Sequence, residues 1–437
     1  MGEAVLSETA YAKRTPKSRM MFERAKKVEP AGVSYRIRFF DPYPFFVKES
    51  KGAQLIDVDG NVYTDYWCTH TAMILGHRHP VVMEAIMMQA EKGWHPGLAH
   101  ELEVVHAEAI TKHVANAEMV RYASSGSEAL LFAIRLARTF TKRLGVAKSE
   151  GGWHGPYDPV HIALRPPFDA PPSGGITKGS QEDTVVVPFN DLEGFLNRTK
   201  GKELACVIVE PVMGAAGMIS AERDFLKGLR EYCDRTGTLL IFDEVVTGFR
   251  LGLSGAQGYF GVKPDLTVLG KIIGGGIPIG AVCGRRDIME HMDHTKYVGL
   301  DYAYHGGTFS GNAISLAAGL ATMDVLEHTS VYEHIDKLGG QLRDTLNAIF
   351  EDAKFPAQVT GVGSLFGIQM TNRKPLKDAN SYLFYDRTQS RKMFYHFLET
   401  GVLILNPEML HGCISSSHTE DDIRHLTSTV ERFVKTK

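Results

Sequence analysis

The sequence predicts an α/β fold with a large, mainly parallel β-sheet and a second, smaller α+β domain. The first observation is an alternation along the middle of the chain, where short apolar runs typical of buried strands alternate with segments of helical spacing. The second is that these runs are apolar throughout, as are parallel strands that helices cover on both faces. The third is length, since 437 residues exceed what one simple core accommodates.

Residues 1–75 form the first segment, in which turns and short strands dominate. The stretch from Gln54 to Val58 predicts a strand that enters a tight Asp-Gly-Asn turn and returns over YTDYW. We expect this N-terminal segment to contribute to the small domain and to the active site.

Residues 76–325 are predicted to form the large domain. Two helical patterns, Val81 to Lys92 and Leu102 to Val114, lead into a strand at Met119 to Ala123 and then into the amphipathic helix SSGSEALLFAIRLARTFTKRL. The Pro- and Gly-rich run that starts at Arg165 is predicted to be a loop. The other elements expected here are strands at Val185 to Val187, Leu204 to Val209, Leu239 to Phe242 and Leu266 to Leu269, and helices such as Asp224 to Thr236 and Asn312 to His328.

Residues 326–437 are predicted to form the smaller C-terminal domain. A helix is expected from about Val331 to Asp352, then a strand in GSLFGIQM, and a closing helix after His418. Thr419 and Asp422 have the spacing of a capping box, which indicates where that last helix begins.

The composition excludes several classes of protein. Hydrophobic residues make up 43% of the chain and charged residues 23%, and no apolar run approaches the roughly 18 residues of a membrane span. The net charge of −3 gives no reason to expect nucleic acid or an anionic membrane as a partner. The N-terminus lacks the apolar core of a secretory signal, so we expect a cytoplasmic location.

Metal, disulfide and hydrolase chemistry find no support in the sequence. The five cysteines are scattered and form no CxxC pair, and the 18 histidines are dispersed. The patterns HExxH, GxSxG and Walker A do not occur. We therefore expect no metal site, and the predicted partners are small molecules and a second copy of the chain.

Two charged residues follow strands in LLIFDEVVTGFRLGLSGAQGYFGVKPDLTVLGKIIGGG. Asp243 ends one predicted strand and Lys271 follows another. Because ligands of open α/β sheets bind outside the carboxyl ends of the strands, the two side chains are expected to converge on one ligand. Pyridoxal phosphate needs such a pair, a lysine amine for the Schiff base and a carboxylate for the pyridine nitrogen. The plainer alternatives are a solvated loop lysine and an aspartate that caps a helix.

A candidate phosphate site lies in SSGSE, residues 124–128, between a predicted strand and a helix. Ser125 and Glu128 have capping-box spacing, and the exposed amides at such a helix terminus are suited to a phosphate. A well-capped helix without a ligand is an equally good interpretation of this fragment. A tightly held phosphate needs hydroxyl groups as well, and Ser127 and Thr308, the latter in HGGTFSGN, are the candidates.

Other candidate residues lie in loops or beside aromatic residues. Trp153, in GGWHG, is suited to stacking on a planar ring, although a loop tryptophan is more often a packing residue. Asn190 and Glu210 follow strands on the presumed ligand side, and Glu210, before a proline, is alternatively a turn residue. Arg36 and Arg38 are suited to clamping a substrate carboxylate, with a solvated or cation–π arginine as the alternative.

Taken together, FDEVVTGFR, PDLTVLGKIIGGGIPIGA, SSGSEA, WHG, FNDLE, VEPV and GGTFSGN resemble the class III pyridoxal-phosphate-dependent aminotransferases, particularly the branch that contains glutamate-1-semialdehyde 2,1-aminomutase. The resemblance covers about Gly32 to Val434. It implies the aspartate aminotransferase-like fold, known as fold type I, and pyridoxal 5′-phosphate as the cofactor. It also implies a homodimer with two active sites at the subunit interface.

The resemblance further implies roles for individual residues. Lys271 matches the Schiff-base lysine of the family and Asp243 the partner of the pyridine nitrogen. Ser125, Gly126 and Ser127 match the phosphate-binding turn, and Thr308 matches a threonine that reaches the phosphate from the neighbouring subunit. Trp153 matches a tyrosine that stacks on the ring, His154 matches the residue after that tyrosine, and Val245 matches the residue on the opposite ring face. Glu210 and Asn190 match positions behind these residues, and Arg38 or Arg36 matches a carboxylate-binding arginine.

A transaminase mechanism is what these roles imply. Lys271 moves a proton between substrate and cofactor, and an amino donor and a keto acid or aldehyde react in turn, which predicts ping-pong kinetics. The chain departs from the aminomutase pattern, since YHGH is GWHGPYD here and Leu410 stands where FEAxF has its acid. We therefore predict an intermolecular aminotransferase for amino acids or amines with an apolar or aromatic side. Glutamate-1-semialdehyde 2,1-aminomutase, of tetrapyrrole biosynthesis, is the alternative, and a cofactor-free scaffold would require Lys271 and Asp243 to be idle.

Overall fold

The computed structural model describes residues 10–436, which divide into two compact units. The small unit contains the described residues up to His79, Glu333–Lys374 and those from Phe384 onward. The large unit runs from Pro80 to Tyr332 and includes Pro375–Leu383, which pack with it although they come late in the chain. Among the described helices, none is both long enough and apolar enough to cross a membrane.

The large unit is built on a seven-stranded sheet. Its strands, in order across the sheet, are β4 (Met119–Ala123), β12 (Gly280–Gly284), β11 (Leu266–Gly270), β10 (Leu239–Asp243), β7 (Leu204–Val209), β5 (Gly145–Ser149) and β6 (Thr184–Val187). Strand β12 pairs antiparallel with both neighbours, while the pairs from β11 to β6 are parallel. Strands β7, β10 and β11 are buried along their whole length, which is why their sequences are continuous apolar runs. The predicted mainly parallel sheet is confirmed.

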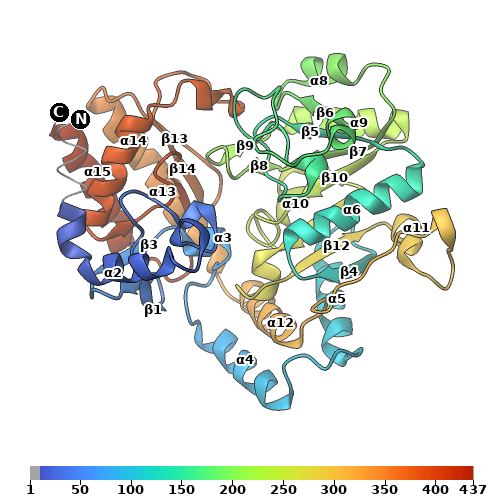
Figure 1. The fold of residues 1–437 in the computed structure, drawn as a ribbon, viewed down its shortest axis with the longest axis horizontal. Coiled ribbons are helices and arrows are strands. Elements are labelled where there is room, and N and C mark those ends of the chain that lie inside the picture. Colours follow the sequence, from blue (N-terminus) through green and yellow to red (C-terminus); the bar gives the residue numbers. More distant parts are fainter. Residues whose placement is uncertain (1–9, 437) are drawn as a thin grey trace. The chain divides into compact units, whose positions relative to one another are not determined.

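Helix α6 (Gly126–Thr141) lies across this sheet (Figure 1). Its residues Leu130 and Ile134 are fully buried in a core that also contains Ile208 and Ile241 from the strands. Full burial of one such side chain contributes about 1.5–3 kcal/mol, so the apolar stripe fixes how the helix lies on the sheet. Because β4 ends at Ala123 and α6 begins at Gly126, the helix starts at the carboxyl end of β4.

Strand β12 was not predicted from the sequence, because it is short and has glycine at both ends. The structure explains one of these glycines. A Cβ atom on Gly280 would lie 2.0 Å from the carbonyl oxygen of Ser125, so only glycine lets β12 pass this close to the start of α6. The other elements of the large unit are α4 (Pro80–Lys92), α5 (Glu101–His113), α7 (Lys178–Glu182), α8 (Leu192–Thr199), α9 (Arg223–Thr236), α10 (Gly255–Phe260), α11 (Arg286–Met289) and α12 (Ala313–His328), and the short strands β8 (Val212–Met213) and β9 (Ile219–Ser220).

The small unit contains two sheets. One has the order β1 (Val47–Lys51), β2 (Gln54–Asp57), β3 (Val62–Asp65), β15 (Val402–Leu403), and the other has β13 (Gln358–Thr360), β14 (Leu365–Gln369), β16 (His411–Cys413). The β2–β3 pair is antiparallel, which confirms the predicted hairpin. Its main helices are α2 (Pro16–Ala25), most of α13 (Val331–Asp352), α14 (Arg387–Glu399) and α15 (Glu420–Lys435). The predicted capping box is present at the start of α15, where Thr419 and Asp422 bond reciprocally.

Candidate active site

The carboxyl ends of β10 and β11 bring Asp243 and Lys271 to the same edge of the large sheet. The two strands are parallel neighbours, with Asp243 opposite Val268 in register. Lys271 comes directly after β11, as the first residue of the 3-10 turn η4 (Lys271–Gly274). The convergence expected from the sequence is thus what parallel pairing produces in this sheet.

Asp243 is a buried carboxylate held by two donors. The Nδ1 atom of His154 lies 2.8 Å from Oδ2 of Asp243, and the backbone N–H of Val245 donates to Oδ1 at 3.2 Å. Because the carboxylate accepts, Nδ1 of the histidine carries the hydrogen, which leaves Nε2 as an acceptor when the ring is neutral. Burial lowers the pKa of His154, an effect that its hydrogen bond to Asp243 opposes. His154, predicted among the cofactor contacts, is therefore seen here as the partner of Asp243.

Glu210 lies just after β7 and holds the loop that carries Trp153. Its Oε1 accepts from the backbone N–H of Trp153 at 2.7 Å, and its Oε2 accepts from that of Gly214 at 3.1 Å. Burial, and then the nearby carboxylate of Asp243, raise the pKa of Glu210, while its two hydrogen bonds and the charge of Lys271 act in the opposite direction. The carboxyl group thus both fixes the tryptophan backbone and belongs to one electrostatic system with Asp243 and Lys271.

Lys148, in β5, is a functional candidate that the sequence interpretation missed. Its Nζ is fully buried and donates to the carbonyl oxygens of Gly152 at 2.9 Å and Ile162 at 2.6 Å. Burial lowers the pKa of this amine to about 7, against the field of Glu210. The signal was a charged residue inside a strand of a covered sheet, where an unpaired charge is costly. Lys148 and Glu210 together fix both sides of the peptide between Gly152 and Trp153.

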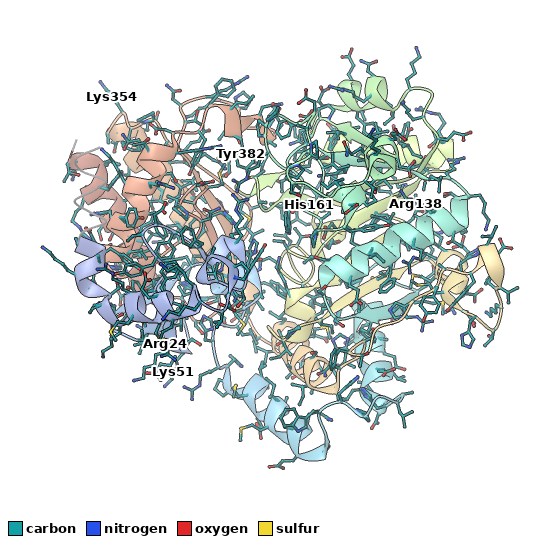
Figure 2. The ribbon with its side chains drawn as sticks, viewed as in Figure 1. Arg24, Lys51, Arg138, His161, Lys354 and Tyr382 are labelled. Carbon is teal, nitrogen blue, oxygen red and sulfur yellow. The ribbon has the colours of Figure 1, made fainter. Side chains whose placement is uncertain are left out.

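The Trp153 side chain is half-buried beside this anchored backbone. Its ring meets the ring of His161, which Figure 2 labels, edge-on with centroids 5.7 Å apart and an interplanar angle of 77°. Such an edge contact leaves at least one face of the indole uncovered by His161. The ring-stacking role of Trp153 stays a prediction.

The start of α6 is capped by side chains of its own first turn. The Oγ of Ser125 accepts from the backbone N–H of Glu128 at 3.2 Å, and the Glu128 carboxylate accepts from the N–H of Ser124 at 2.6 Å. In the expected capping box, Glu128 would accept from the N–H of Ser125. In the structure it accepts instead from the N–H of Ser124, one residue earlier. Ser127, the predicted phosphate hydroxyl, packs against Gly155, where a Cβ would lie 2.3 Å from its Oγ.

Close glycine contacts join the helix start to the two strand ends. A Cβ atom on Gly126 would lie 2.6 Å from Cγ2 of Val245, two residues after Asp243. A Cβ on Gly270, the residue before Lys271, would lie 3.4 Å from Cγ1 of Val245 and 3.7 Å from Cα of Gly126. Gly126 at the start of α6, Val245 near Asp243 and Gly270 beside Lys271 are therefore in direct contact. A larger residue at Gly126 would push the helix terminus away from Val245.

The backbone of Lys271 is strained. Its φ of 52° lies in the left-handed region, which costs a non-glycine residue about 1–3 kcal/mol. Such conformations persist only where the surrounding structure determines them, and they occur most often at functional sites. Exposed Lys354 has a similar φ, but Lys271 is half-buried directly after a buried strand, which distinguishes it from a solvated loop lysine.

Four further predicted residues show no contact that assigns them to this group. Arg36 and Arg38 are exposed in the 3-10 turn η2 (Arg36–Arg38) of the small unit, and their substrate role stays a prediction. Thr308 is exposed, and its carbonyl oxygen accepts from Nε2 of His95. Asn190 joins loops of the large unit, since its amide donates to the carbonyl oxygens of Ser220 and Lys377.

The arrangement defines a class of enzyme. A buried carboxylate with a fixed partner suits a protonated pyridine nitrogen, an amine at the next strand end suits an aldehyde, and a helix start suits a phosphate. Gly126, Val245 and Gly270 pack together between these groups, where such a ring would bind. The residues present therefore fit pyridoxal phosphate. Residues 38–410 match the class III aminotransferase family, and the chain belongs to this family of pyridoxal-phosphate-dependent enzymes.

Relatives within the family carry two kinds of name. The chain is 40% identical over 422 residues to glutamate-1-semialdehyde 2,1-aminomutase of Methanothrix thermoacetophila, covering 96% of each chain. Among solved structures, an omega-transaminase from Sphaerobacter thermophilus is 34% identical with a TM-score of 0.89, covering 96% of this chain and 97% of that one. A β-phenylalanine aminotransferase from Variovorax paradoxus is 29% identical with a TM-score of 0.92, covering 99% and 97%. The predicted fold type I is confirmed by these transaminase structures.

Proposed function

We propose that the enzyme binds pyridoxal 5′-phosphate at this edge of the sheet. Lys271 would hold the cofactor through its aldehyde carbon, Asp243 would face the pyridine nitrogen, and Ser125, Gly126 and Ser127 would receive the phosphate at the start of α6. Trp153 and Val245 would cover the two ring faces. The observation that carries this proposal is the buried Asp243–His154 pair beside the strand end of Lys271.

The residues of the chain then have distinct tasks in amino transfer. When bound, pyridoxal phosphate supplies a conjugated ring that stores the electron pair released as the amine carbon loses its proton. Lys271 takes that proton on Nζ and returns it. Asp243 would supply a negative charge to the ring nitrogen, and His154 fixes the orientation of that carboxylate by donating from Nδ1. Glu210 and Lys148 hold the Trp153 backbone so that its indole excludes water from one face.

For the substrate, we propose intermolecular amino transfer from amines or amino acids with an apolar or aromatic side. Leu410 stands where the aminomutase pattern has its acid, and it is fully buried in the small unit. Its carbonyl oxygen accepts from the N–H of Ile368 at 2.8 Å, which fixes its backbone beside β14. A fully buried leucine offers no carboxylate for a polar substrate. The name of one structure that this chain resembles, a β-phenylalanine aminotransferase, agrees with this substrate class.

Glutamate-1-semialdehyde 2,1-aminomutase is the second candidate, because relatives of that name are about 40% identical over nearly the whole chain. A single-turnover experiment separates the two. The purified protein is loaded with pyridoxal phosphate and mixed with one amine at a time, without acceptor, while visible absorption is recorded. We expect an aromatic β-amino acid or an aromatic amine to convert the cofactor. Conversion by glutamate-1-semialdehyde or its diamino form alone would establish the aminomutase instead.

We also propose that the enzyme works as a homodimer in which Thr308 of the partner subunit reaches the phosphate. The segment around Thr308 is exposed in the single chain, and His95 and His100 bond to its backbone. Apolar side chains of these two segments and of the start of α5 are each more than half exposed, namely Trp94, Leu98, Val104 and Phe309. A surface of this kind is typical of an interface between copies. Sedimentation at twice the mass of the chain is expected, and a stable active monomer would contradict the proposal.

A further inference from the structure

His106 is a buried histidine of the large unit that the proposed mechanism does not use. It lies in α5 with 0% of its surface exposed. Its Nε2 lies 2.7 Å from the carbonyl oxygen of Ile273, in the turn η4 that Lys271 begins. Its Nδ1 lies 2.9 Å from the hydroxyl of Tyr122 in β4. The ring therefore connects a helix, a strand and the turn of Lys271.

The partners of His106 fix where its hydrogen lies. A carbonyl oxygen only accepts, so Nε2 carries the hydrogen and donates it to Ile273. Nδ1 then accepts from the Tyr122 hydroxyl, whose oxygen is also 3.4 Å from the Glu103 carbonyl. Burial lowers the pKa of His106 to about 4, so the ring is neutral near pH 7. The Ile273 carbonyl thus fixes the tautomer, and the Tyr122 hydroxyl complements it as a donor to Nδ1.

The carbonyl group of Ile273 also packs against helix α12, at Gly319. A Cβ atom on Gly319 would lie 1.8 Å from the Ile273 oxygen and 2.7 Å from Nε2 of His106. Only glycine at this position permits the hydrogen bond. Further along, the hydroxyl of Ser315 donates to the carbonyl oxygen of Pro278 at 2.8 Å. Helices α5 and α12 therefore both hold the chain that follows Lys271, through hydrogen bonds to its carbonyl groups.

We propose that His106, hydrogen-bonded on its other side to Tyr122, is a positioning residue that holds the strained Lys271 turn. It acts through the Ile273 carbonyl, two residues after the left-handed backbone of Lys271. A strained residue needs surrounding contacts that determine its conformation, and this bond supplies one from outside the turn. The inference rests on the proposed role of Lys271 as the residue that holds the cofactor and moves the proton.

Three variants test the hydrogen bond from His106 to the Ile273 carbonyl, which we call the tether. His106→Leu removes the donor and roughly keeps the volume, whereas His106→Gln restores an N–H donor near the position of Nε2. Tyr122→Phe removes only the hydroxyl that bonds to Nδ1 of His106. The matched control is His396→Leu, because Nε2 of His396 donates to the Thr429 carbonyl at 3.1 Å in the small unit. The control deletes a similar histidine–carbonyl bond that is remote in sequence from Lys271.

The first measurement is amide hydrogen exchange of cofactor-free protein in peptides that span residues 266–280. His106→Leu is expected to speed exchange there about tenfold, Tyr122→Phe about threefold, and His106→Gln less than about twofold, as the loss of one hydrogen bond predicts. His396→Leu should leave this segment unchanged. Equal exchange in wild type and His106→Leu, or equal acceleration by Leu and Gln, would overturn the proposal. If the leucine variant does not fold, the Tyr122→Phe and His106→Gln results decide it.

The second measurement uses the loaded enzyme and a converting amine. In His106→Leu, the single-turnover rate constant at saturating amine should fall about tenfold while the amine concentration at half-saturation stays near the wild-type value. An effect on half-saturation alone would contradict a positioning role. If the wild-type protein takes up no pyridoxal phosphate, the proposed function fails, while the exchange experiment on cofactor-free protein still decides whether the tether exists.

Discussion

The two strand ends of the candidate site are held in different ways. Around Asp243 the support comes from ionisable side chains, since His154 contacts the carboxylate and Glu210, whose pKa burial and the nearby Asp243 raise, holds the neighbouring loop. Around Lys271 the support comes from neutral groups, namely the imidazole of His106, backbone carbonyls and the missing side chain of Gly319. One side fixes a charge and the other fixes a backbone conformation.

The difference follows from what each residue must do in amino transfer. A carboxylate that stabilises a ring cation has to stay charged and still, and a hydrogen-bond donor with a fixed tautomer achieves this. An amine that takes and returns a proton has to change its charge in every cycle. The neutral tether to Ile273 holds the turn of this amine without adding a charge beside it.

Replacing Lys271 itself is expected to have the largest effect. Lys271→Ala should lower the single-turnover rate by more than about 10³-fold, because both the attachment point and the proton carrier are lost. The fold should persist, and since alanine has the same Cβ as lysine at this left-handed position, the melting temperature of the cofactor-free protein should stay close to that of wild type. Stopped-flow absorption and thermal melts measure the two effects. Lys263→Ala, at an exposed position nearby, is the control, and a turnover in Lys271→Ala close to that of the control would disprove the assignment.

Asp243→Asn is expected to have the next largest effect. The amide keeps an acceptor for Nδ1 of His154 but loses the charge under the ring nitrogen, so the rate should fall about 10²–10³-fold with the cofactor still bound. Asp234→Asn is the control, since Asp234 forms only an exposed ion pair with Arg230. Single-turnover rates and bound cofactor are measured for each variant. Unchanged rates in Asp243→Asn would show that charge fixation is not the role of this strand end.

The features that local patterns determine could be predicted from the sequence. The strand β4 and the helices α4, α5 and α6 follow from apolar spacing, and the placement of Asp243 and Lys271 follows from the rule that parallel strands end together. The capping box of α15 was predicted from two residues. In each case the physical cause lies within a few neighbouring residues.

Contacts between distant segments could not be predicted in this way. Lys148 resembles any strand lysine until the structure shows its amine buried against two carbonyl groups. His106 resembles any helix residue, because its partners Tyr122 and Ile273 lie 16 and 167 positions away in the chain. Glycines such as Gly319 are required by atoms of other elements, which no local pattern contains. The roles of Thr308, Arg36 and Arg38 stay predictions for the same reason.

Glu210→Gln is expected to have the smallest effect and to show it as a pH dependence. Both carboxyl oxygens of Glu210 accept backbone N–H groups, so a glutamine, with one acceptor oxygen, should lower the free energy of unfolding by about 1–3 kcal/mol at acidic pH. Burial raises the pKa of Glu210 above its ordinary value, so the folded protein holds a proton that the unfolded chain releases. The stability that this group contributes is therefore complete below its ordinary pKa and is lost as the pH rises through the folded value.

Glu210→Gln lacks this titration. The difference between its free energy of unfolding and that of the wild type should therefore become smaller as the pH rises. Urea unfolding of the cofactor-free proteins at about pH 5.5 and about pH 8 measures the change, which amounts to about 1.4 kcal/mol for each unit of pKa shift within that window. Gln181, exposed in α7, offers the control Gln181→Glu, whose difference from wild type should not change between the two pH values. A deficit of Glu210→Gln that is constant with pH would mean that Glu210 is charged throughout, and that the Asp243 side of the site holds two fixed negative charges against Lys271 rather than one.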